Sequence, residues 1–177
     1  MSSDSILLLS LIIFLPAAGA LLVALLPKGQ DDLAKKVSLG VTIIVFLLTV
    51  WIAIPAASGG AGSTRFVIGE AKMQQAFSVE WISAFDIFYS LGIDGISFPL
   101  VILTSFLSVL AMWASWPINK HVKAYCALFL LLEMGMLGVF MSLDFFLFYI
   151  FWEVMLLPMY FLIGVWGGPR REYAAIK

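Results

Sequence analysis

The sequence predicts an all-α membrane protein with five transmembrane helices and the start of a sixth. Of its 177 residues, 63% are hydrophobic and only 12% are charged, whereas soluble globular domains average about 25% charged residues. Five apolar runs are each long enough to cross the hydrocarbon core of a bilayer, which takes about 20 residues of helix. With a net charge of −1, the chain offers nucleic acid no basic surface to bind.

The five predicted spans, in chain order, are residues 6–26, 37–54, 97–116, 124–141 and 144–165. Pro16 and Pro158 fall inside spans, where neighbouring helices can satisfy the backbone groups that a proline frees. Asp144 begins the fifth span and is expected to be its N-cap. The start of the chain lacks the basic region of a signal peptide, so the first span is expected to be retained as a helix.

Basic residues predict the orientation of the spans. They lie in three groups on one side of the membrane: Lys28, Lys35 and Lys36; Lys120 and Lys123; and Arg170, Arg171 and Lys177. Only Arg65 and Lys72 fall on the other side, in a long loop at about residues 55–96. The positive-inside rule therefore places the N-terminus and this loop outside. The absence of a transit peptide favours a bacterial cell membrane, which would make both periplasmic.

The long loop divides into two parts. Its first part, residues 55–65, consists mainly of small residues and is expected to be flexible. Residues 76–97, by contrast, are rich in aromatic and β-branched side chains. That composition predicts extended structure packed on the outer surface. Asp94, flanked by Gly92 and Gly95, marks a turn, and Ser97 is expected to be the N-cap of the third span.

Two regions follow from this pattern. Residues 1–116 hold the first three spans and the long loop, and residues 117–177 hold the fourth and fifth spans and the start of a sixth. Because an apolar segment begins near Tyr173 and the sequence ends at Lys177, we expect the sequence to be a piece of a longer chain.

Glu153 lies in the middle of the fifth span and is the first candidate functional residue. A charged residue at a membrane helix centre costs roughly 2.5–3.5 kcal/mol on insertion scales. Tyr149 and Tyr160 lie on the same helical face and can donate hydrogen bonds to a carboxylate. Pro158 frees the carbonyl of Val154, which offers a place for an ordered water. Such an acid commonly marks a proton or ion path.

Glu133, near the middle of the fourth span, is the second candidate. A link of two or three residues makes the fourth and fifth spans an antiparallel hairpin, so both acids lie at a similar depth. The alternative for each is a structural, protonated acid hydrogen-bonded within the bundle. That alternative is stronger for Glu133, whose neighbours are apolar. Gly135 and Gly138 are expected to permit close helix packing rather than to bind a ligand.

Other polar residues support weaker hypotheses. Thr104, Ser108 and Ser115 share a helical face, which favours interhelical hydrogen bonds over a wet path. The five predicted spans contain no Lys or Arg, so any cation that pairs with Glu153 is expected outside them. Cys126 is the only cysteine, which excludes an internal disulfide. No phosphate loop, nucleotide fingerprint, metal-ligand cluster or hydrolase triad is present, so we expect neither redox centre, cofactor nor metal in this chain.

Two segments resemble a known family. The run from Ser142 to Lys177, SLDFFLFYIFWEVMLLPMYFLIGVWGGPRREYAAIK, resembles the antiporter-like M subunit of respiratory complex I, the relative of mitochondrial subunit 4. YSLGIDGIS, before the third span, is similar to the same family. The phrase FWEVMLLPMYFLIGVWG is the most specific part, because related cation/proton antiporters share the Phe/Trp-Glu pair but usually not the Pro-Met-Tyr that follows.

The resemblance implies a fourteen-helix antiporter-like fold with two inverted five-helix repeats, helices four to eight and nine to thirteen. This chain would form its first part, and residues 117–177 would begin the first proton-channel repeat. In the family, the glutamate of helix five, here Glu153, pairs with a lysine on a broken helix seven. Lys177 lies too early to be that lysine. Glu133 falls where some members carry an acid and others an apolar residue.

The implied function is proton translocation within NADH:quinone oxidoreductase, coupled to electron transfer from NADH to quinone. NADH, FMN, iron–sulfur clusters and quinone would be bound elsewhere in the complex. The implied partners are other membrane-arm subunits, including neighbouring antiporter-like subunits, and the lipid bilayer. Two alternatives stay open: a subunit of a cation (sodium)/proton antiporter of the same superfamily, and a passive membrane scaffold.

Overall fold

The computed structural model describes residues 3–27, 29–54, 66–67 and 73–177. Its elements are α1 (Ser3–Leu25), α2 (Asp31–Ala53), β1 (Gln74–Ile82), a short 3₁₀ turn η1 (Ser83–Phe85), β2 (Ile87–Ile93), α3 (Ser97–Ala114), α4 (Val122–Met141), α5 (Phe145–Trp166) and α6 (Arg171–Ile176). Within the described part of the chain, α1 to α5 are long and apolar enough to cross a membrane. The predicted fold class, five membrane helices and the start of a sixth, is confirmed.

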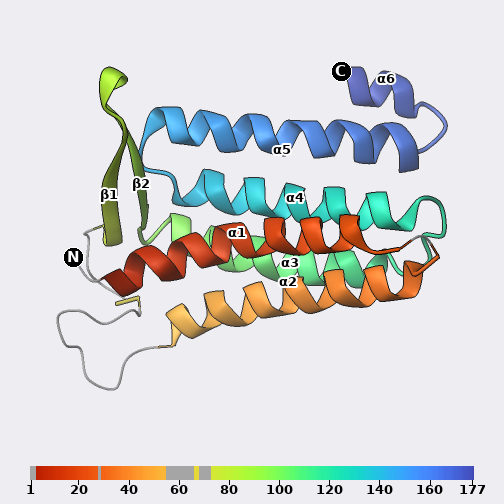
Figure 1. Cartoon of the computed structure of the whole chain (residues 1–177), viewed down its shortest axis with the longest axis horizontal. Helices are drawn as coiled ribbons and strands as arrows, with labels where there is room; N and C mark the ends of the chain where they lie inside the picture. Colours follow the sequence, from red (N-terminus) through yellow and green to blue (C-terminus); the bar gives the residue numbers. More distant parts are fainter. Residues whose placement is uncertain (1–2, 28, 55–65, 68–72) are drawn as a thin grey trace.

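The five long helices run side by side along the longest axis of the molecule (Figure 1). α4 is the central helix, since it packs against α1, α2, α3 and α5. α5 forms an outer layer on α4, and the short α6 folds back along the end of α5 (Figure 1). This arrangement buries about half of α4 and leaves much of α5 uncovered.

The second part of the long loop forms an antiparallel hairpin of β1 and β2, which confirms the extended structure expected there. It stands at the end of the bundle opposite the α1–α2, α3–α4 and α5–α6 connections (Figure 1). Tyr89 joins it to α1 through a 3.0 Å hydrogen bond with Ser10. The amide of Leu143, between α4 and α5, donates to the carbonyl of Ser90 at 2.9 Å. The hairpin thus ties the first helix to the α4–α5 turn.

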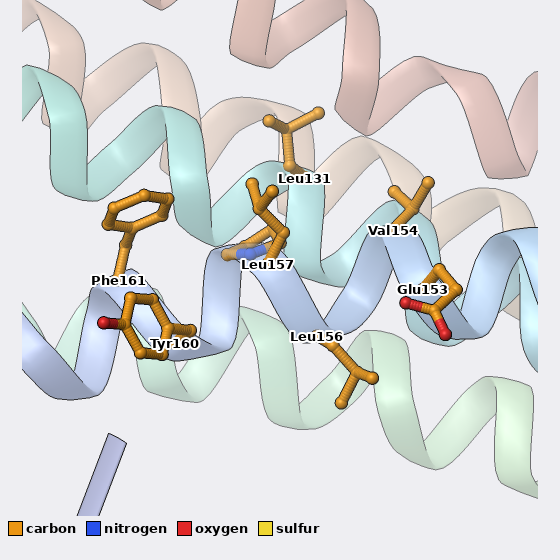
Figure 2. Close-up of a pocket in the computed structure, with 8 residues that line it drawn as sticks. Leu131, Glu153, Val154, Leu156, Leu157, Tyr160 and Phe161 are labelled. Carbon is orange, nitrogen blue, oxygen red and sulfur yellow. The ribbon is translucent and has the colours of Figure 1, made fainter. Parts of the chain in front are cut away.

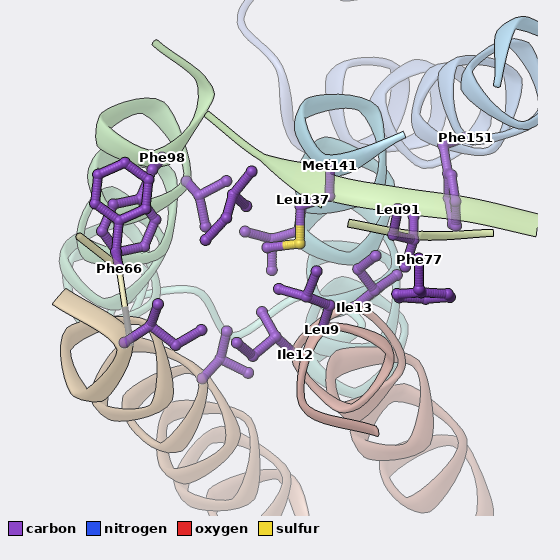
Figure 3. Close-up of a cluster of buried hydrophobic side chains, with 14 of the residues drawn as sticks. Leu9, Ile12, Ile13, Phe66, Phe77, Leu91, Phe98, Leu137, Met141 and Phe151 are labelled. Atoms are coloured by element: carbon purple, nitrogen blue, oxygen red, sulfur yellow. The ribbon is translucent and has the colours of Figure 1, made fainter. Parts of the chain in front are cut away.

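A core of buried apolar side chains lies beneath this hairpin. Leu9 and Ile12 of α1, Leu91 of β2, and Leu137 and Met141 of α4 meet there (Figure 3). Because these side chains contact one another, the hairpin is part of the same hydrophobic core as the helices. Its buried apolar surface stabilises the folded chain by about 25 cal/mol per Å².

Two glycines let α4 and α5 approach closely, as the sequence predicts. A Cβ atom on Gly138 would overlap the ring of Phe151, and one on Gly135 would lie 2.9 Å from the Cβ of Met155. Small residues at such positions allow helix backbones to pack closely in membranes. These contacts also fix how α5 is aligned along α4.

The start of α2 differs from the prediction. The helix begins at Asp31 rather than near residue 37, so Lys35 and Lys36 lie inside it. Lys35 is buried and donates to the carbonyl of Trp116 at 2.9 Å and to Asn119 Oδ1 at 3.4 Å. The prediction that the spans hold no lysine is therefore wrong. Asp31 and Asp32 in the first turn favour the earlier start, because acids complement the helix N-terminus.

One predicted N-cap is confirmed and one is wrong. The Asp144 carboxylate accepts hydrogen bonds from the amides of Phe146 at 2.9 Å and Leu147 at 3.1 Å. At α3, however, the acceptor is Asp94, which lies three residues before Ser97. Its carboxylate accepts a hydrogen bond from the Ser97 amide at 2.6 Å. Hydrogen bonds from the backbone and side chain of Ser97 lower the pKa of Asp94. Ser97 instead accepts from the Asp94 amide at 3.0 Å.

Part of the orientation argument lies outside the described residues. That part is Lys28, Arg65 and Lys72. Residues 55–65, which the sequence predicts to be flexible, also lie outside the described residues.

Candidate functional site

Glu153 lies near the middle of α5 and is exposed on the side of that helix away from the bundle. Tyr149, one turn earlier, is half exposed, and its hydroxyl lies within hydrogen-bonding reach of the Glu153 carboxylate. Tyr149 and Glu153 are neighbours because they are four residues apart, which puts both side chains on one helical face. The expected neighbour of the acid is therefore in place.

A shallow depression of about 800 Å³ lies beside Glu153 (Figure 2). Its lining comes from α5 and one residue of α4: Leu131, Glu153, Val154, Leu156, Leu157, Pro158, Tyr160 and Phe161. Pro158 lies inside the helix and is buried. Because a proline has no amide hydrogen, the carbonyl of Val154 loses its helical partner, and Val154 itself lines the depression.

Tyr160 lines the same depression, two turns along α5 from the acid (Figure 2). Its ring packs edge-on against Phe161, with centroids 5.5 Å apart. Four of the five residues singled out from the sequence, namely Tyr149, Glu153, Pro158 and Tyr160, thus gather along one stretch of α5. The fifth does not join them.

Glu133 is fully buried inside the bundle, on the side of α4 that faces α3. Ser108 of α3 is its polar neighbour, but neither oxygen of the carboxyl group makes a hydrogen bond to the described part of the chain. Gly138 faces Phe151 and Gly135 faces Met155, so Glu153 is level with residues 136–137. The acids therefore differ in depth by about one helical turn, roughly 5 Å, but face different surroundings.

The face of α5 around Glu153 is otherwise apolar and aromatic. Its exposed large side chains are Phe145, Phe146, Tyr149, Trp152, Leu157, Met159, Tyr160 and Phe161. A carboxylate in contact with lipid tails is strongly disfavoured. The acid therefore indicates that this face meets protein or water rather than lipid alone.

Several polar residues of the interior were not identified from the sequence. The buried stripe of α2 contains Lys35, Ser38, Thr42 and Thr49. Their separations of three, four and seven residues are the signal of a shared helical face. On α3, Ser105 rather than Thr104 bonds across helices, to Thr49 at 2.9 Å. Ser115 makes an interhelical bond to Tyr125 at 2.6 Å, as expected.

Residues 142–177, which include Glu153, match the family model described as NADH:quinone oxidoreductase/Mrp antiporter, TM. The chain is 37% identical over 166 residues to the chloroplast NAD(P)H-quinone oxidoreductase chain 4 of Mesostigma viride. It is 38% identical over 170 residues to NAD(P)H-quinone oxidoreductase chain 4 of Prochlorococcus marinus strain MIT 9515. These alignments cover 94% and 96% of this chain but only 31% and 30% of the relatives.

The fold is also similar to a chain in the structure of respiratory complex I from Thermus thermophilus with bound NADH. The TM-score is 0.72 at 22% identity, over 94% of this chain and 31% of that one. At this identity the likeness shows the fold alone. The chain spans about a third of the length of the relatives that it matches. The predicted resemblance to the antiporter-like M subunit of respiratory complex I is confirmed.

Proposed function

We propose that this chain is part of a proton-translocating membrane-arm subunit of NADH:quinone oxidoreductase. In that role it moves protons while other subunits pass electrons from NADH to quinone. The observation that carries the proposal is Glu153, an acid near the centre of α5 inside the matched segment 142–177. An intramembrane acid is costly and is by default a functional site.

Glu153 is the proton-exchanging group in this proposal. Tyr149 donates a hydrogen bond to the ionised carboxylate and so helps to hold it when the proton has left. The freed carbonyl of Val154 and the hydroxyl of Tyr160 offer hydrogen-bonding groups to water in the adjoining depression. These groups give a proton a way to reach the acid.

A movable cation completes the mechanism. A cation close to Glu153 stabilises the ionised form, and its withdrawal raises the proton affinity of the carboxylate. The return of the cation then expels the proton. Lys35, the buried lysine, bonds to the α3–α4 connection and not to Glu153. The cation is therefore proposed to come from a part of the subunit beyond the described residues, or from a neighbouring subunit.

The same proposal places NADH, FMN, iron–sulfur clusters and quinone in other subunits of the complex. The partners are other membrane-arm subunits, including neighbouring antiporter-like ones. We place the N-terminus on the periplasmic side of a bacterial cell membrane. Basic residues support this orientation. Lys35 lies near the start of α2, Lys120 and Lys123 at the α3–α4 connection and the start of α4, and Arg170 between α5 and α6. These parts of the fold all lie at the end of the bundle opposite the hairpin (Figure 1).

The family model also covers cation/proton antiporters of the Mrp type. The curated relatives at 37% and 38% identity are instead named NAD(P)H-quinone oxidoreductase chain 4. They favour the oxidoreductase over the antiporter. A passive scaffold would not require an acid at position 153. That alternative predicts that an apolar residue in place of Glu153 is tolerated.

The proposal is tested by Glu153→Gln in the full-length subunit, assembled in its complex and reconstituted into vesicles. Proton uptake driven by NADH oxidation should fall by about a hundredfold or more, the scale of a lost acid–base group, while assembly is unchanged. Glu80→Gln is the matched control, because Glu80 is exposed on the hairpin. Pumping at the wild-type rate in the Glu153→Gln variant would rule the proposal out.

A further inference from the structure

A second polar feature runs through the bundle interior, on the other side of α4 from Glu153. We name it the polar seam. Its residues come from three helices and are at most 7% exposed: Lys35, Ser38, Thr42 and Thr49 of α2, Ser105 and Ser108 of α3, and Glu133 of α4. Buried polar side chains are rare inside membranes and need partners. Seven on three adjoining helices require an explanation.

The seam is continuous along the helix axes. Lys35 pairs with Asn119 at one end, and Thr49 pairs with Ser105 toward the other. From Lys35 to Thr49 the path covers roughly 21 Å along α2, of a hydrocarbon core of about 30 Å. The antiparallel alignment that these two pairs set makes Ser108 and Glu133 level with residues 45–46 of α2. Glu133 therefore lies well inside the seam.

Some hydroxyl groups in the seam are satisfied and others are not. Thr42, Thr49 and Ser105 donate to helix carbonyls at 2.7 to 3.0 Å. By contrast, Ser38 Oγ, Ser108 Oγ and both carboxyl oxygens of Glu133 are fully buried without a hydrogen bond to the described part of the chain. The thiol of Cys126 lies beside Ser38, and a thiol is a weak partner.

Unpartnered polar atoms of this kind are the usual sites of buried water. Burying a polar group without a hydrogen bond is unfavourable by several kcal/mol in an apolar medium. Structural waters typically make about three hydrogen bonds to such groups. The unpartnered atoms lie at two levels, Ser38 nearer the Lys35 end and Ser108 with Glu133 deeper. Water at both levels would satisfy all four atoms.

The surroundings of Glu133 also determine its protonation. α1 presents apolar residues such as Ile13 and Ala20 to the core, and Glu153 of α5 lies on the outer surface. Lys35, on α2, is about eleven residues away along the seam, or roughly 16 Å. On α3, Ser108 is the group that faces the carboxyl. An ionised carboxylate here would have no cation near it among the described residues, which favours the neutral acid.

We propose that the polar seam is a hydrated proton-binding site, in which Glu133 is a neutral acid reached by water from the Lys35 end. The ligands are water and a proton. The site is separate from the Glu153 face, because α4 lies between them (Figure 1). The proposal therefore does not depend on Glu153 or on turnover of the complex.

The test uses the full-length subunit in its complex, at rest, and infrared difference spectroscopy. A carbonyl band of a protonated carboxylic acid should be present, should disappear in Glu133→Gln, and should shift when the sample is moved into D₂O. Ser108→Ala should displace the same band, because the hydroxyl next to the acid is lost. This second variant keeps the assignment possible if Glu133→Gln fails to assemble.

Access from the Lys35 end is tested by Ser38→Val, which puts apolar surface into the seam. The exchange of the Glu133 proton for deuterium should slow roughly tenfold or more, as expected when a buried water loses a polar partner. Ser115→Val is the matched control, because the Ser115 hydroxyl bonds to Ala111 and Tyr125 outside the seam.

Three results would overturn the proposal. The first is the absence of a protonated-acid band that depends on Glu133 or Ser108. That result is expected if Glu133 is instead an ionised carboxylate that binds a metal cation. The second is a band that does not respond to D₂O, which would mean a dry site. The third is wild-type exchange in Ser38→Val, which would place the water path elsewhere.

Discussion

At the scale of single residues, Glu153 and Glu133 differ in what surrounds the carboxyl group. Glu153 is exposed on the outer face of α5, with Tyr149 as its polar neighbour. Glu133 is fully buried, with Ser108 beside it and no hydrogen bond to the described residues. Removing a charge from water is unfavourable unless a partner compensates. Glu153 therefore needs a partner beyond the described residues, whereas Glu133 is accommodated by water and protonation.

How far sequence predicts a residue's role depends on how local that role is. Asp144 was identifiable as a cap, because its bonds to Phe146 and Leu147 span only three residues. Ser97 was not correctly assigned, because the Asp94 carboxylate accepts from the amides of Ile96 and Ser97, and the Ser97 hydroxyl accepts in return from the Asp94 amide. The burial of Lys35 depends on the α3–α4 connection, some eighty positions away, and no local pattern specifies that contact.

The cap at α5 gives a residue-scale prediction. Asp144→Ala should destabilise the first turn of α5 by about 1 kcal/mol, the usual cost of losing an N-cap. The amides of Phe146 and Leu147 lose their acceptor and should exchange faster with deuterium, as measured by hydrogen–deuterium exchange with mass spectrometry. Asp144→Asn keeps an acceptor at the same position and should behave like the wild type. Equal exchange in the alanine and wild-type proteins would show that Asp144 does not stabilise the helix.

At the scale of elements, composition is sufficient to find the membrane helices but not their ends or their faces. α5 runs from Phe145 to Trp166, within one residue of the predicted span at each end, because its apolar run is sharply bounded. α2 begins six residues earlier than predicted because its first turns are polar. The spacing of the polar residues of α2 predicts that they share one helical face. The helices that cover this face, α3 and α4, are known only from the packing of the bundle.

The contact between α4 and α5 gives an element-scale prediction. Gly138→Ala should destabilise this helix pair by about 1–3 kcal/mol, since the added methyl group overlaps the Phe151 ring and overpacking has that typical cost. The measurement is the thermal unfolding midpoint of the full-length subunit in its complex.

Gly40→Ala is the matched control for that change. Gly40 lies inside α2, and apart from the adjoining backbone of α2 no atom of the described residues lies within 4 Å of an added Cβ. Alanine is about 1 kcal/mol better than glycine in a helix interior, so the control should keep or raise the midpoint. A midpoint in Gly138→Ala as high as in the control would contradict the close α4–α5 packing.

At the scale of the whole molecule, α4 is the best covered of the five long helices and α5 is the least covered. α4 is enclosed by four helices, and α5 shows a broad aromatic face with a single acid on it. The matched relatives are about three times as long as this chain, and in our proposal helices beyond the described residues cover that face. What covers the exposed face of α5 could not be derived from the sequence, because no local pattern in residues 145–166 specifies a partner for it.

The central claim is that Glu153 faces a protein partner and water rather than lipid. A structure of the complete subunit in its complex, resolved well enough to place side chains and ordered water, tests it most directly. We predict a lysine or arginine nitrogen within about 4 Å of the Glu153 carboxylate, or joined to it by one ordered water, with helices covering the α5 face. A Glu153 side chain surrounded by lipid tails, without water or a basic group in reach, would contradict the account.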